Sequence, residues 1–581
     1  MIAAHWLGLA VAVPFAGALL IALAGRWPNL RDGVSLATAV ALFGAVLMAL
    51  RGLLAGEPMT LALVELFPGL ALALHTEPLS ILFASLASGL WIVTAVYAIG
   101  YMRGLGEKHQ TRFYCCFAVS LGAAIGVAFS ANLLTLFVFY ELLTFATYPL
   151  VAHKESDEAR SGARTYLAVL LASSILFLLP AIAWTYALAG TLDFRLGGIL
   201  PRGVEPLSAV LLLALFVLGT AKAAVMPVHR WLPAAMVAPT PVSALLHAVA
   251  VVKAGVFAIV KVVLYVFGTE MLGRFPAERL LVWLAGFTIV AASLVALRQQ
   301  NLKRMLAYST VGQLSYVVLA TLVLTPFAEI GAALHIVAHA FGKITLFFAA
   351  GAIYVASKKT ELGELGGIGR RMPITMLAFA IGALSMIGVP PTAGFASKWY
   401  IIAGAFQLDD YFVLAVITLS TGLNAAYFLP VVFRAFFREE ERPPAKAHGE
   451  APWPMVAALA TTALLTLLFF FYNGPVVEPR GRPRGTRRMS GQEHWLARPR
   501  TIRWLWRIFG LLLAAALLAQ WFDPRAWSFR SRRAVRLPCP LRLPRLRGDG
   551  AVREADRARA QASRRLLRPR CLRSSCRPPS S

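Results

Sequence analysis

Glu141 and Lys222 lie inside long apolar stretches of this sequence, where an ionised side chain needs a physical reason to be present. Glu141 falls in the stretch 131–151 and Lys222 in the stretch 206–229. A charged side chain at the centre of a lipid bilayer costs at least about 2.5–3.5 kcal/mol, and such residues commonly line ion paths. Burial weakens the hold of a lysine on its proton and a nearby carboxylate strengthens it, so such a pair can take up and release protons. We therefore predict that both residues carry protons; the alternatives are a protonated, hydrogen-bonded Glu141 and a Lys222 that extends to a helix end.

Other titratable residues continue this pattern in later apolar stretches. Lys253 lies in the middle of the stretch 241–267, and His247 precedes it on the same helix by one to two turns. The stretch 329–355 carries two histidines and a lysine at spacings of four residues, which places all three on one slowly drifting face of a helix. A single core histidine usually only hydrogen-bonds a neighbour, whereas three titratable groups on one face favour proton relay. The predicted path contains the following residues: Glu141, Lys222, His247, Lys253, His335, His339, Lys343 and Lys398.

Other kinds of site find less support in the sequence. His335 and His339 have the spacing of a metal-binding pair, but no third or fourth ligand of suitable type is evident, so neither a metal nor a cofactor is predicted. Lys261 lies near the end of its stretch and is predicted to extend toward the membrane surface. No nucleophile or phosphate-binding loop is evident. The chain is therefore not expected to perform catalytic chemistry of its own, although it can belong to a redox-driven translocase.

Prolines interrupt two of the apolar stretches close to a lysine. Pro227 lacks the N–H of the helical hydrogen bond, and it is predicted to bend its helix one turn beyond Lys222. Pro390 and Pro391 are predicted to break the twelfth stretch, with Lys398 two turns further on. Within lipid a broken helix persists only where it lines protein or water, so each break indicates a hydrated cavity beside its lysine.

The composition indicates the class of fold. Hydrophobic residues make up 58% of the chain and charged residues only 14%, and the mean hydropathy is +0.68. Ordinary soluble domains do not have such a balance, and stretches of about 20 apolar residues can cross a hydrocarbon core of about 30 Å. Backbone polar groups in lipid are satisfied within helices, so we predict an all-α polytopic membrane protein. About fourteen spans are expected: 6–24, 34–54, 77–101, 113–129, 131–151, 164–189, 206–229, 241–267, 279–297, 306–325, 329–355, 373–405, 411–436 and 453–472.

Charge in the loops predicts the orientation of these spans. Lys and Arg gather in the loops after odd-numbered spans, so the positive-inside rule places those loops in the cytoplasm and both ends of the fourteen-span unit outside. The first stretch has no basic leader and no small-residue cleavage site, so it is predicted to be a retained helix. The two broken spans are five spans apart, which suits two repeats inverted across the membrane. The expected division is 1–112 for spans 1–3, 113–267 for the first repeat, 279–436 for the second, 453–472 for span 14 and 473–581 for a tail.

The tail differs in composition from the rest of the chain. Of the formal net charge of +28, residues 480–581 carry +21, from 26 Arg and 5 acidic residues, and residues 1–479 carry +7. One further apolar stretch, 504–522, lies within the tail. Its excess of Arg, Pro and Ala is typical of a GC-rich gene read out of its native frame, and the alternative is a disordered basic arm that binds anionic lipid. No nucleic-acid partner is predicted, and the five cysteines have no spacing that suits a disulfide framework or zinc.

Two motifs in the sequence are long enough to be specific for a family. They are the run PVHRWLPAAMVAPTPVSALLH at 227–247 and the run NLKRMLAYSTVGQLSY at 301–316. These runs resemble the signatures of the antiporter-like subunits. That family is shared by Mrp-type multisubunit cation/proton antiporters, the proton-pumping membrane arm of respiratory complex I, and membrane-bound hydrogenases. The resemblance covers residues 1–472.

The resemblance implies fourteen helices, inverted five-helix repeats and broken helices 7 and 12. Glu141 matches the family's fifth-helix glutamate, Lys222 its seventh-helix lysine and Lys253 its eighth-helix lysine. Lys398 matches the charged position of the twelfth helix, and the three titratable residues within 329–355 fall where the family places polar residues of the eleventh helix. The tail and its apolar stretch depart from the family pattern.

The resemblance implies a proton-translocating subunit of a multisubunit monovalent cation/proton antiporter, most similar to the D subunit of the Mrp type. Its expected partners are other membrane subunits, protons, Na⁺ or K⁺ and the lipid bilayer, and its expected location is a bacterial-type inner (cytoplasmic) membrane. The alternative is a proton-pumping membrane subunit of a complex I-like NADH:quinone oxidoreductase or of a membrane-bound hydrogenase, driven by electron transfer in partner subunits. A third hypothesis from another class is a membrane scaffold whose charges only hold helices together.

Overall fold

Helices dominate the structure, a computed structural model that describes residues 2–67, 70–274, 278–440 and 449–471. Within this part of the chain, 11 helices are long and apolar enough to cross a membrane. The other three expected spans are helices interrupted by turns or by wider helical turns. The count of fourteen spans and their division into two repeats therefore stay predictions. The tail, with its apolar stretch 504–522, lies outside the described residues.

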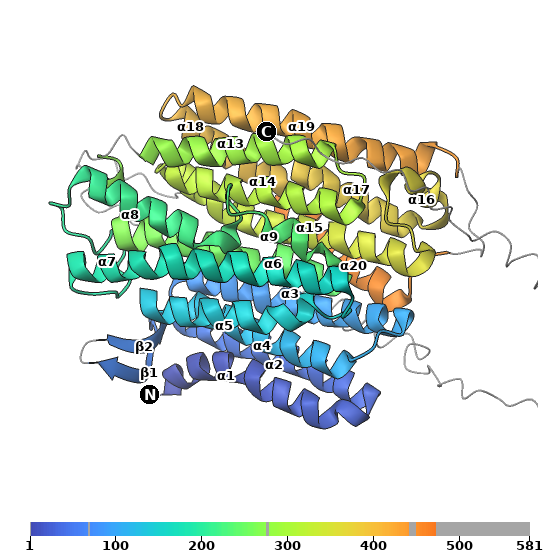
Figure 1. Ribbon diagram of the computed structural model, residues 1–581, viewed down its shortest axis with the longest axis horizontal. Coiled ribbons are helices and arrows are strands. Elements are labelled where there is room, and N and C mark those ends of the chain that lie inside the picture. Colours follow the sequence, from blue (N-terminus) through green and yellow to red (C-terminus); the bar gives the residue numbers. More distant parts are fainter. Residues whose placement is uncertain (1, 68–69, 275–277, 441–448, 472–581) are drawn as a thin grey trace, which may run out of the picture. The chain divides into compact units, whose positions relative to one another are not determined.

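The long helices lie side by side in one bundle (Figure 1). Those that run without a break are α1 (Ile2–Leu23), α2 (Pro28–Leu54), α3 (Pro78–Leu105), α4 (Gln110–Phe129), α5 (Leu133–Val151), α13 (Glu278–Leu297), α14 (Leu302–Leu322), α15 (Pro326–Ser357), α19 (Tyr411–Phe437) and α20 (Trp453–Phe471). A π-helical turn, η2 (Ser174–Leu178), joins α6 (Asp157–Ser173) to α7 (Leu179–Ala189). The short elements of the loops are η1 (Ala24–Arg26), α12 (Thr269–Leu272), η7 (Leu362–Leu365) and α16 (Ile368–Arg371).

The seventh expected span is broken at its lysine. Helix α8 (Pro206–Gly219) ends first, a 3-10 turn η3 (Ala221–Ala223) holds Lys222, and α9 (Trp231–Ala234) follows after an irregular segment. The break itself was predicted, but its predicted position one turn beyond Lys222 is wrong, because the helix already ends before the lysine. The Ser173 hydroxyl donates to the carbonyls of Leu218 (2.6 Å) and Gly219 (3.2 Å), so the end of α8 is satisfied without any contribution from Pro227.

The twelfth expected span is broken where its two prolines predict. Helix α17 (Pro373–Ile387) ends at Gly388, which adopts a left-handed conformation (φ +91°), and α18 (Ala393–Phe406) begins after Pro390 and Pro391. A Cβ at Gly394 would lie only 1.7 Å from the Ser385 carbonyl oxygen, so the two half-helices overlap closely. Glycine is therefore required at this crossing.

The eighth expected span has an irregularity that the sequence did not predict. It consists of α10 (Thr240–Ala244), a π-helical segment η5 (Leu245–Val249), α11 (Val251–Lys261) and a second π-helical segment η6 (Val262–Phe267). No proline lies within or after η5 in this span, so the usual signal for a helix break is missing. Segments of π-helix inside α-helices are frequent at functional sites.

A small two-stranded antiparallel hairpin accompanies the helices, whose dominance confirms the predicted helical fold class. It is formed by β1 (Thr60–Phe67) and β2 (Leu70–His75), with Thr60 opposite His75. Its strands contain residues such as Thr60 and Val64, which favour extended backbone. Leu74 at the end of β2 also pairs with Ser130 just before α5, so the hairpin is attached to the bundle. We call this end of the bundle the hairpin end; it lies at the left of Figure 1.

The opposite end of the bundle, at the right of Figure 1 near α16, carries the loops rich in Lys and Arg. Ion pairs join these loops, such as Arg112 with Glu155 (2.6 Å) and Lys359 with Glu440 (2.7 Å). We call it the basic end. The loops that the charge pattern assigned to one side of the membrane thus lie together.

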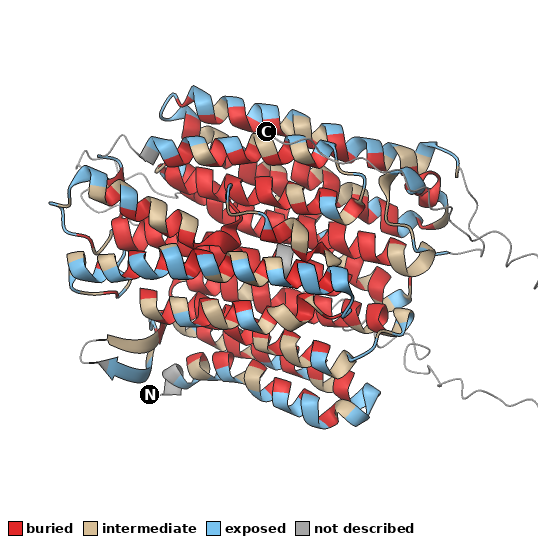
Figure 2. Ribbon diagram, viewed as in Figure 1, coloured by how far each residue is buried: buried red, intermediate tan, exposed pale blue. Residues whose placement is uncertain are grey.

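Burial divides the helices into central and peripheral ones (Figure 2). The most apolar windows of α3 and α15 are wholly buried, whereas those of α1, α13 and α19 are half-buried or less. The exposed faces of the peripheral helices carry large apolar side chains, including Trp283 and Phe287 of α13 and Phe433 of α19. Extensive exposed apolar surface is typical of a membrane-embedded protein, which agrees with the composition.

Candidate functional site

Lys222 contacts helix α5 on both sides of Glu141. Its Nζ donates hydrogen bonds to the Tyr140 carbonyl (2.8 Å) and to the Thr144 hydroxyl (2.7 Å). The same Nζ lies 3.1 Å from the centroid of the Tyr140 ring, in a cation–π contact. The Lys222 backbone N–H donates to the Tyr140 hydroxyl (3.1 Å). Because Lys222 is wholly buried, these uncharged groups take the place of water around its amine.

The Glu141 carboxylate has no hydrogen bond within the part of the chain that the structure describes. Both of its oxygens are buried and lack a partner among the described residues. Glu141 lies on α5 next to the two residues that Lys222 contacts, but it forms no direct hydrogen bond with Lys222. A buried carboxylate that accepts no hydrogen bond is costly in its charged form. Such a group is suited to bind a proton or a water molecule.

Helix α11 holds the break around Lys222 in place. A Cβ at Gly255 would lie 2.1 Å from the backbone nitrogen of Ala223 and 2.4 Å from the carbonyl carbon of Lys222, so only glycine allows this approach. The Trp231 Nε1–H donates to the Ala221 carbonyl (2.8 Å). A backbone carbonyl freed by the break thus finds a partner.

Lys253 and His339 are joined directly across α11 and α15. Lys253 Nζ lies 2.6 Å from His339 Nδ1, and both side chains are buried. The ring of His335, one turn earlier on α15, lies 6.3 Å from that of His339 between centroids. His335 Nδ1 is 2.9 Å from the Ser397 hydroxyl of α18. These four residues form one buried polar cluster between three helices.

Lys398 folds back across the second break. Its Nζ donates to the Ile387 carbonyl (2.8 Å) and the Met386 carbonyl (3.3 Å), both at the end of α17, and to the Thr421 hydroxyl (3.1 Å) of α19. The last carbonyls of a helix carry partial negative charge. The ammonium group of Lys398 therefore caps the helix that the break has opened.

Tyr316 of α14 lies between this lysine and the histidines. Its ring centroid is 5.3 Å from that of His335, and Lys398 Nζ is 5.0 Å from the Tyr316 centroid. One polar contact and three ring contacts therefore lead from Lys253 through His339, His335 and Tyr316 to Lys398. We call this series the central line.

Three of the predicted path residues stand apart from the central line. Glu141 and Lys222 form a separate group, and no hydrogen bond within the described part of the chain joins Lys222 to Lys253. Lys343 donates to the Leu306 carbonyl (3.2 Å) and is not hydrogen-bonded to any member of the central line. The side chain of His247 lies outside the described residues.

The prediction for Lys261 is wrong. The side chain does not extend to the membrane surface: only 1% of it is exposed, and its Nζ forms an ion pair with Glu77 Oε1 (2.9 Å). The sequence could not reveal this partner, because Glu77 precedes α3 and is remote in the chain. Tyr140, Tyr316 and Ser397 were missed as well, since uncharged polar residues are common in membrane helices and carry no distinct signal.

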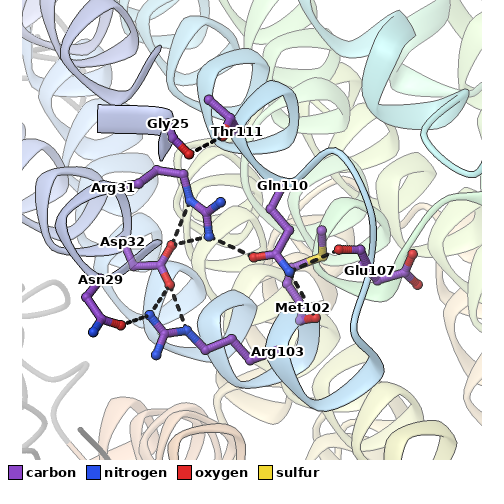
Figure 3. A network of polar contacts seen from close by, with 9 residues as sticks. All are labelled: Gly25, Asn29, Arg31, Asp32, Met102, Arg103, Glu107, Gln110 and Thr111. Atoms are coloured by element: carbon purple, nitrogen blue, oxygen red, sulfur yellow. Dashed lines mark hydrogen bonds and ion pairs between the residues drawn. The ribbon is translucent and has the colours of Figure 1, made fainter. Parts of the chain in front are cut away.

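A further polar network lies at the basic end and joins α2, α3 and α4 (Figure 3). Asp32 accepts hydrogen bonds from Arg31 at one carboxylate oxygen (2.8 and 3.0 Å) and from Arg103 at the other (2.6 and 2.8 Å). Arg31 also donates to the Gln110 side chain (2.7 Å). Both oxygens of Asp32 are satisfied, unlike those of Glu141. This network therefore fixes three helices to one another and has no group left vacant for a proton.

A cavity of about 680 Å³ opens at the basic end beside α6, α14 and α15. Basic side chains line it, among them Lys154, Lys303 and Arg304, and it also reaches Tyr101 and Thr240. Thr240 begins the interrupted eighth span, which carries Lys253 further along. The cavity thus reaches from the basic end to the helix that holds one end of the central line.

Helix α5, which carries Glu141, ends at this same basic end beside titratable groups. Burial and the charge of Arg112 lower the pKa of His153 to about 4. A hydrogen bond from Arg112 and its charge also lower the pKa of the exposed Glu155. His153 is therefore uncharged and Glu155 ionised near neutral pH.

The fold and the buried polar groups define a multi-pass membrane protein with titratable residues in its core. Residues 130–424 match the family model described as NADH:quinone oxidoreductase/Mrp antiporter, TM. The chain belongs to this family, as its motifs predicted.

Relatives come from both branches of the family. Subunit N of the NADH-quinone oxidoreductase of Desulforudis audaxviator is 34% identical over 426 residues, which cover 72% of this chain and 84% of the relative. Subunit L of the same kind of enzyme from Mycobacterium tuberculosis is 31% identical over 477 residues, covering 78% and 73%. The A/B subunit of a probable K(+)/H(+) antiporter of Rhizobium meliloti is 34% identical over 401 residues, covering 66% of this chain and 39% of the relative.

Solved structures share the fold. A chain of the membrane-bound sulfane sulfur reductase, an archaeal respiratory membrane complex, superposes with a TM-score of 0.70 at 25% identity and covers 81% of this chain. A chain of the Mrp complex from a Dietzia species superposes with a TM-score of 0.74 at 20% identity and covers 89% of this chain. Both of these chains are subunits of larger membrane complexes.

Proposed function

We propose that this chain conducts protons as a subunit of a multisubunit monovalent cation/proton antiporter. The observation that carries the proposal is the buried carboxylate of Glu141, which has no hydrogen-bond partner among the described residues. It lies on α5 beside Lys222, which is held in the broken seventh span. Family membership and the antiporter relative of Rhizobium meliloti support the same function.

The Glu141 carboxylate controls the charge of Lys222 in this proposal. When Glu141 is ionised, its negative charge stabilises the ammonium form of Lys222. When Glu141 takes up a proton, Lys222 keeps only the Tyr140 carbonyl and ring and the Thr144 hydroxyl as partners. Lys222 then releases its proton toward the central line.

Water carries the proton from Lys222 to Lys253, because the described side chains do not bridge them. Lys253 passes it directly to His339, whose Nδ1 is 2.6 Å away. His335 and Tyr316 connect His339 to Lys398, where the broken twelfth span again leaves backbone carbonyls facing the ammonium group. We place His247 and Lys343 beside this route as additional proton-binding groups.

We further propose that the basic end faces the cytoplasm of a bacterial-type cell and the hairpin end the outside. The positive-inside rule supports this orientation for a chain of the inner membrane. Both ends of the helical unit then lie outside. The cavity lined by Lys154 and Lys303 supplies protons from the cytoplasm.

The partners proposed for this chain are other membrane subunits, and the exchanged ion is Na⁺ or K⁺. A second candidate function is that of a proton-pumping subunit in a quinone-reducing membrane complex. The match to subunit N favours it, because that match covers 84% of the relative, against 39% for the antiporter relative. Proton flux that requires electron transfer to quinone and ignores Na⁺ and K⁺ would establish the second function in place of the first.

Inverted membrane vesicles that contain the whole complex test the proposal. A pH-sensitive dye reports proton flux after addition of Na⁺ or K⁺. We expect Glu141→Gln and Lys222→Met to lower this flux at least tenfold while the complex still assembles. The control is Lys358→Met, which changes an exposed lysine at the basic end and should leave the flux unchanged. Wild-type flux in both core variants would instead support the scaffold hypothesis.

A further inference from the structure

Glu77 and Lys261 form a buried ion pair at the hairpin end, outside the path proposed above. Glu77 Oε1 lies 2.9 Å from Lys261 Nζ, and the two side chains are 9% and 1% exposed. Lys261 also donates to the Ser130 carbonyl (2.8 Å), and the Ser80 hydroxyl donates to Glu77 Oε1 (3.1 Å). Burying two charges costs as much free energy as their attraction returns, so a buried ion pair is weak evidence for a role in stability alone.

Aromatic rings enclose the amine of Lys261 on two sides. The Phe194 centroid lies 4.1 Å from Lys261 Nζ and the Phe257 centroid 5.7 Å from it. Phe194 belongs to the loop between α7 and α8 at the hairpin end and is half-buried, whereas Phe257 lies on α11 and is fully buried. The amine is therefore covered by one ring toward the surface and by another toward the protein interior.

Phe257 also separates Lys261 from the central line. Lys253 and Lys261 lie on the same helix, eight residues or about 12 Å apart along its axis, and Phe257 lies midway between them. The Phe257 ring packs against Phe83 of α3, with centroids 5.0 Å apart. Two phenylalanines thus form an apolar barrier between two buried lysines. Apolar constrictions of this kind control passage by admitting or excluding water.

Other titratable groups face the ion pair from the surrounding elements. Tyr265 of η6 lies with its ring 5.6 Å from Lys261 Nζ, and Glu329 in the first turn of α15 acts on Tyr265 through its charge. His75 at the end of β2 is half-buried, and its Nδ1 lies 2.8 Å from the Thr60 hydroxyl. Burial lowers the pKa of His75, Glu77 raises it and Lys261 lowers it. His75 is the group of this set that reaches the surface of the hairpin.

We propose that Glu77 and Lys261 form a proton-release site that branches from Lys253 toward the hairpin end, with Phe83 and Phe257 as the gate between them. This inference rests on the proposed function. It places an exit at the near end of the central line, and Lys398 at the far end stays necessary because its positive charge favours release of the proton from Lys253 toward Lys261.

The proton balance of this site closes over one cycle. Lys261 in its ammonium form gives its proton to the Glu77 carboxylate, which leaves a neutral amine and a neutral carboxylic acid. Glu77 then releases the proton to water at the hairpin end, beside His75, and becomes a carboxylate again. The amine of Lys261 takes the next proton from Lys253 through water that enters between the two phenylalanines. One proton leaves per cycle and the ion pair is restored.

Lys261→Arg separates proton transfer from ion pairing. Arginine keeps the positive charge beside Glu77, but it does not lose its proton in proteins. In vesicles with the whole complex we expect normal assembly and at least a tenfold loss of cation-driven proton flux. The matched control is Arg279→Lys, the reverse exchange in another ion pair at the hairpin end, formed with Asp410. This control should conduct like the wild type.

Phe257→Ala tests the gate directly. Its result does not depend on whether an arginine side chain fits in place of Lys261. Without the ring, water can join Lys253 to Lys261, so we expect proton leak without added cation to rise at least twofold. The double variant Phe257→Ala/Lys261→Arg should abolish that leak, an outcome that a purely structural ion pair would not give. A leak that persists in the double variant would overturn the proposal.

Lys222→Met, measured in the same vesicles, distinguishes failure of this inference from failure of the proposed function. If Lys222→Met removes the flux and Lys261→Arg conducts like the wild type, the release site is wrong and the proposed function stands. If both variants conduct like the wild type, the release site and the proposed function are both wrong.

Discussion

Lys222 and Lys398 lie at the two broken helices, but different groups hold them. Lys222 lies within the break and reaches to another helix, where it contacts the residues around Glu141. Lys398 lies beyond its break and reaches back to the last two carbonyls of the preceding half-helix, at Met386 and Ile387. The first lysine thus has an ionisable neighbour, and the second has fixed backbone dipoles.

This difference shows how two similar breaks can serve different steps. A carboxylate beside a lysine stabilises the ammonium form of that lysine only while the carboxylate is ionised. Protonation of the carboxylate therefore lowers the proton affinity of the lysine. Backbone carbonyls at a helix end keep their partial charge at all times. In the proposed function Lys222 is therefore the responsive group, and Lys398 is a group of constant proton affinity.

Close packing at the two breaks gives the largest expected effect. Gly394→Ala places a Cβ 1.7 Å from the Ser385 carbonyl oxygen, and Gly255→Ala places one 2.1 Å from the Ala223 nitrogen. The backbone at Gly394 cannot move without disturbing Lys398, and the backbone at Gly255 cannot move without disturbing Lys222. Each variant should therefore lose about 1–3 kcal/mol of stability, and the loss should be larger for Gly394→Ala. The measurement is the Tm of the solubilised complex. Gly33→Ala, which meets no atom within 4 Å, is the control, and a Tm for Gly394→Ala equal to that of this control would contradict the close crossing of α17 and α18.

Lys398→Met gives the next largest effect. The thioether fills a similar volume without a charge, so we expect stability to change by less than about 1 kcal/mol. Proton flux should nevertheless fall at least tenfold, because the central line loses the group at its end. Flux and Tm measured on the same preparation separate the two effects, with Lys358→Met as the control. Unchanged flux would show that the path does not extend to the twelfth span.

A matched pair of threonine variants compares the two lysines directly. Thr144→Val removes one of two hydrogen-bond acceptors of Lys222, and Thr421→Val removes one of three acceptors of Lys398. A hydrogen bond contributes about 1 kcal/mol, so flux should fall about fivefold in Thr144→Val. It should fall less than about twofold in Thr421→Val, since two carbonyls remain. The reverse order would contradict the distinction between the two lysines.

The smallest expected effect concerns the basic end of α5. The pKa of His153 is about 4 in the folded chain, against about 6.5 in the unfolded chain. Because the neutral form is favoured on folding, its stabilising contribution is complete above pH 6.5 and is lost as the pH falls toward 4. Between pH 7 and pH 5 we expect the Tm of the wild type to fall about 2–4 °C further than that of His153→Gln. The low pKa of Glu155 adds nothing in this range, because that carboxylate stays ionised.

The free-energy cost of placing a charged side chain in the membrane explains why the site residues could be predicted from the sequence. Glu141, Lys222, Lys253 and Lys398 stand out because charged residues are rare in apolar stretches. The family and the membrane-spanning helical fold that these stretches and motifs predicted are confirmed. The role of these residues in proton transfer stays a prediction.

The partners of these residues could not be predicted, because they depend on how distant helices pack. Tyr316 joins the central line only because α14 lies beside α15 and α18, which no local spacing indicates. The prediction for Lys261 is wrong for the same reason. Its position near a span end suggests the membrane surface, whereas its partner Glu77 lies just before α3, far away in the sequence. The hairpin does carry a turn signal that the span assignment overlooked, Pro68-Gly69 between its two strands. The π-helical segment η5 contains neither proline nor glycine.

The π-helical segment η5 determines the direction in which α11 presents its side chains. A π-helical turn contains one residue more than an α-helical turn. It therefore has the structure that results when a single residue is inserted into an ordinary helix. If η5 became regular α-helix without the loss of a residue, α11 would rotate by about 100° about its axis. Lys253 would then point away from His339, Gly255 from the broken seventh span and Lys261 from Glu77. The extra residue in η5 thus sets the rotation of α11 about its axis, and all three contacts depend on that rotation.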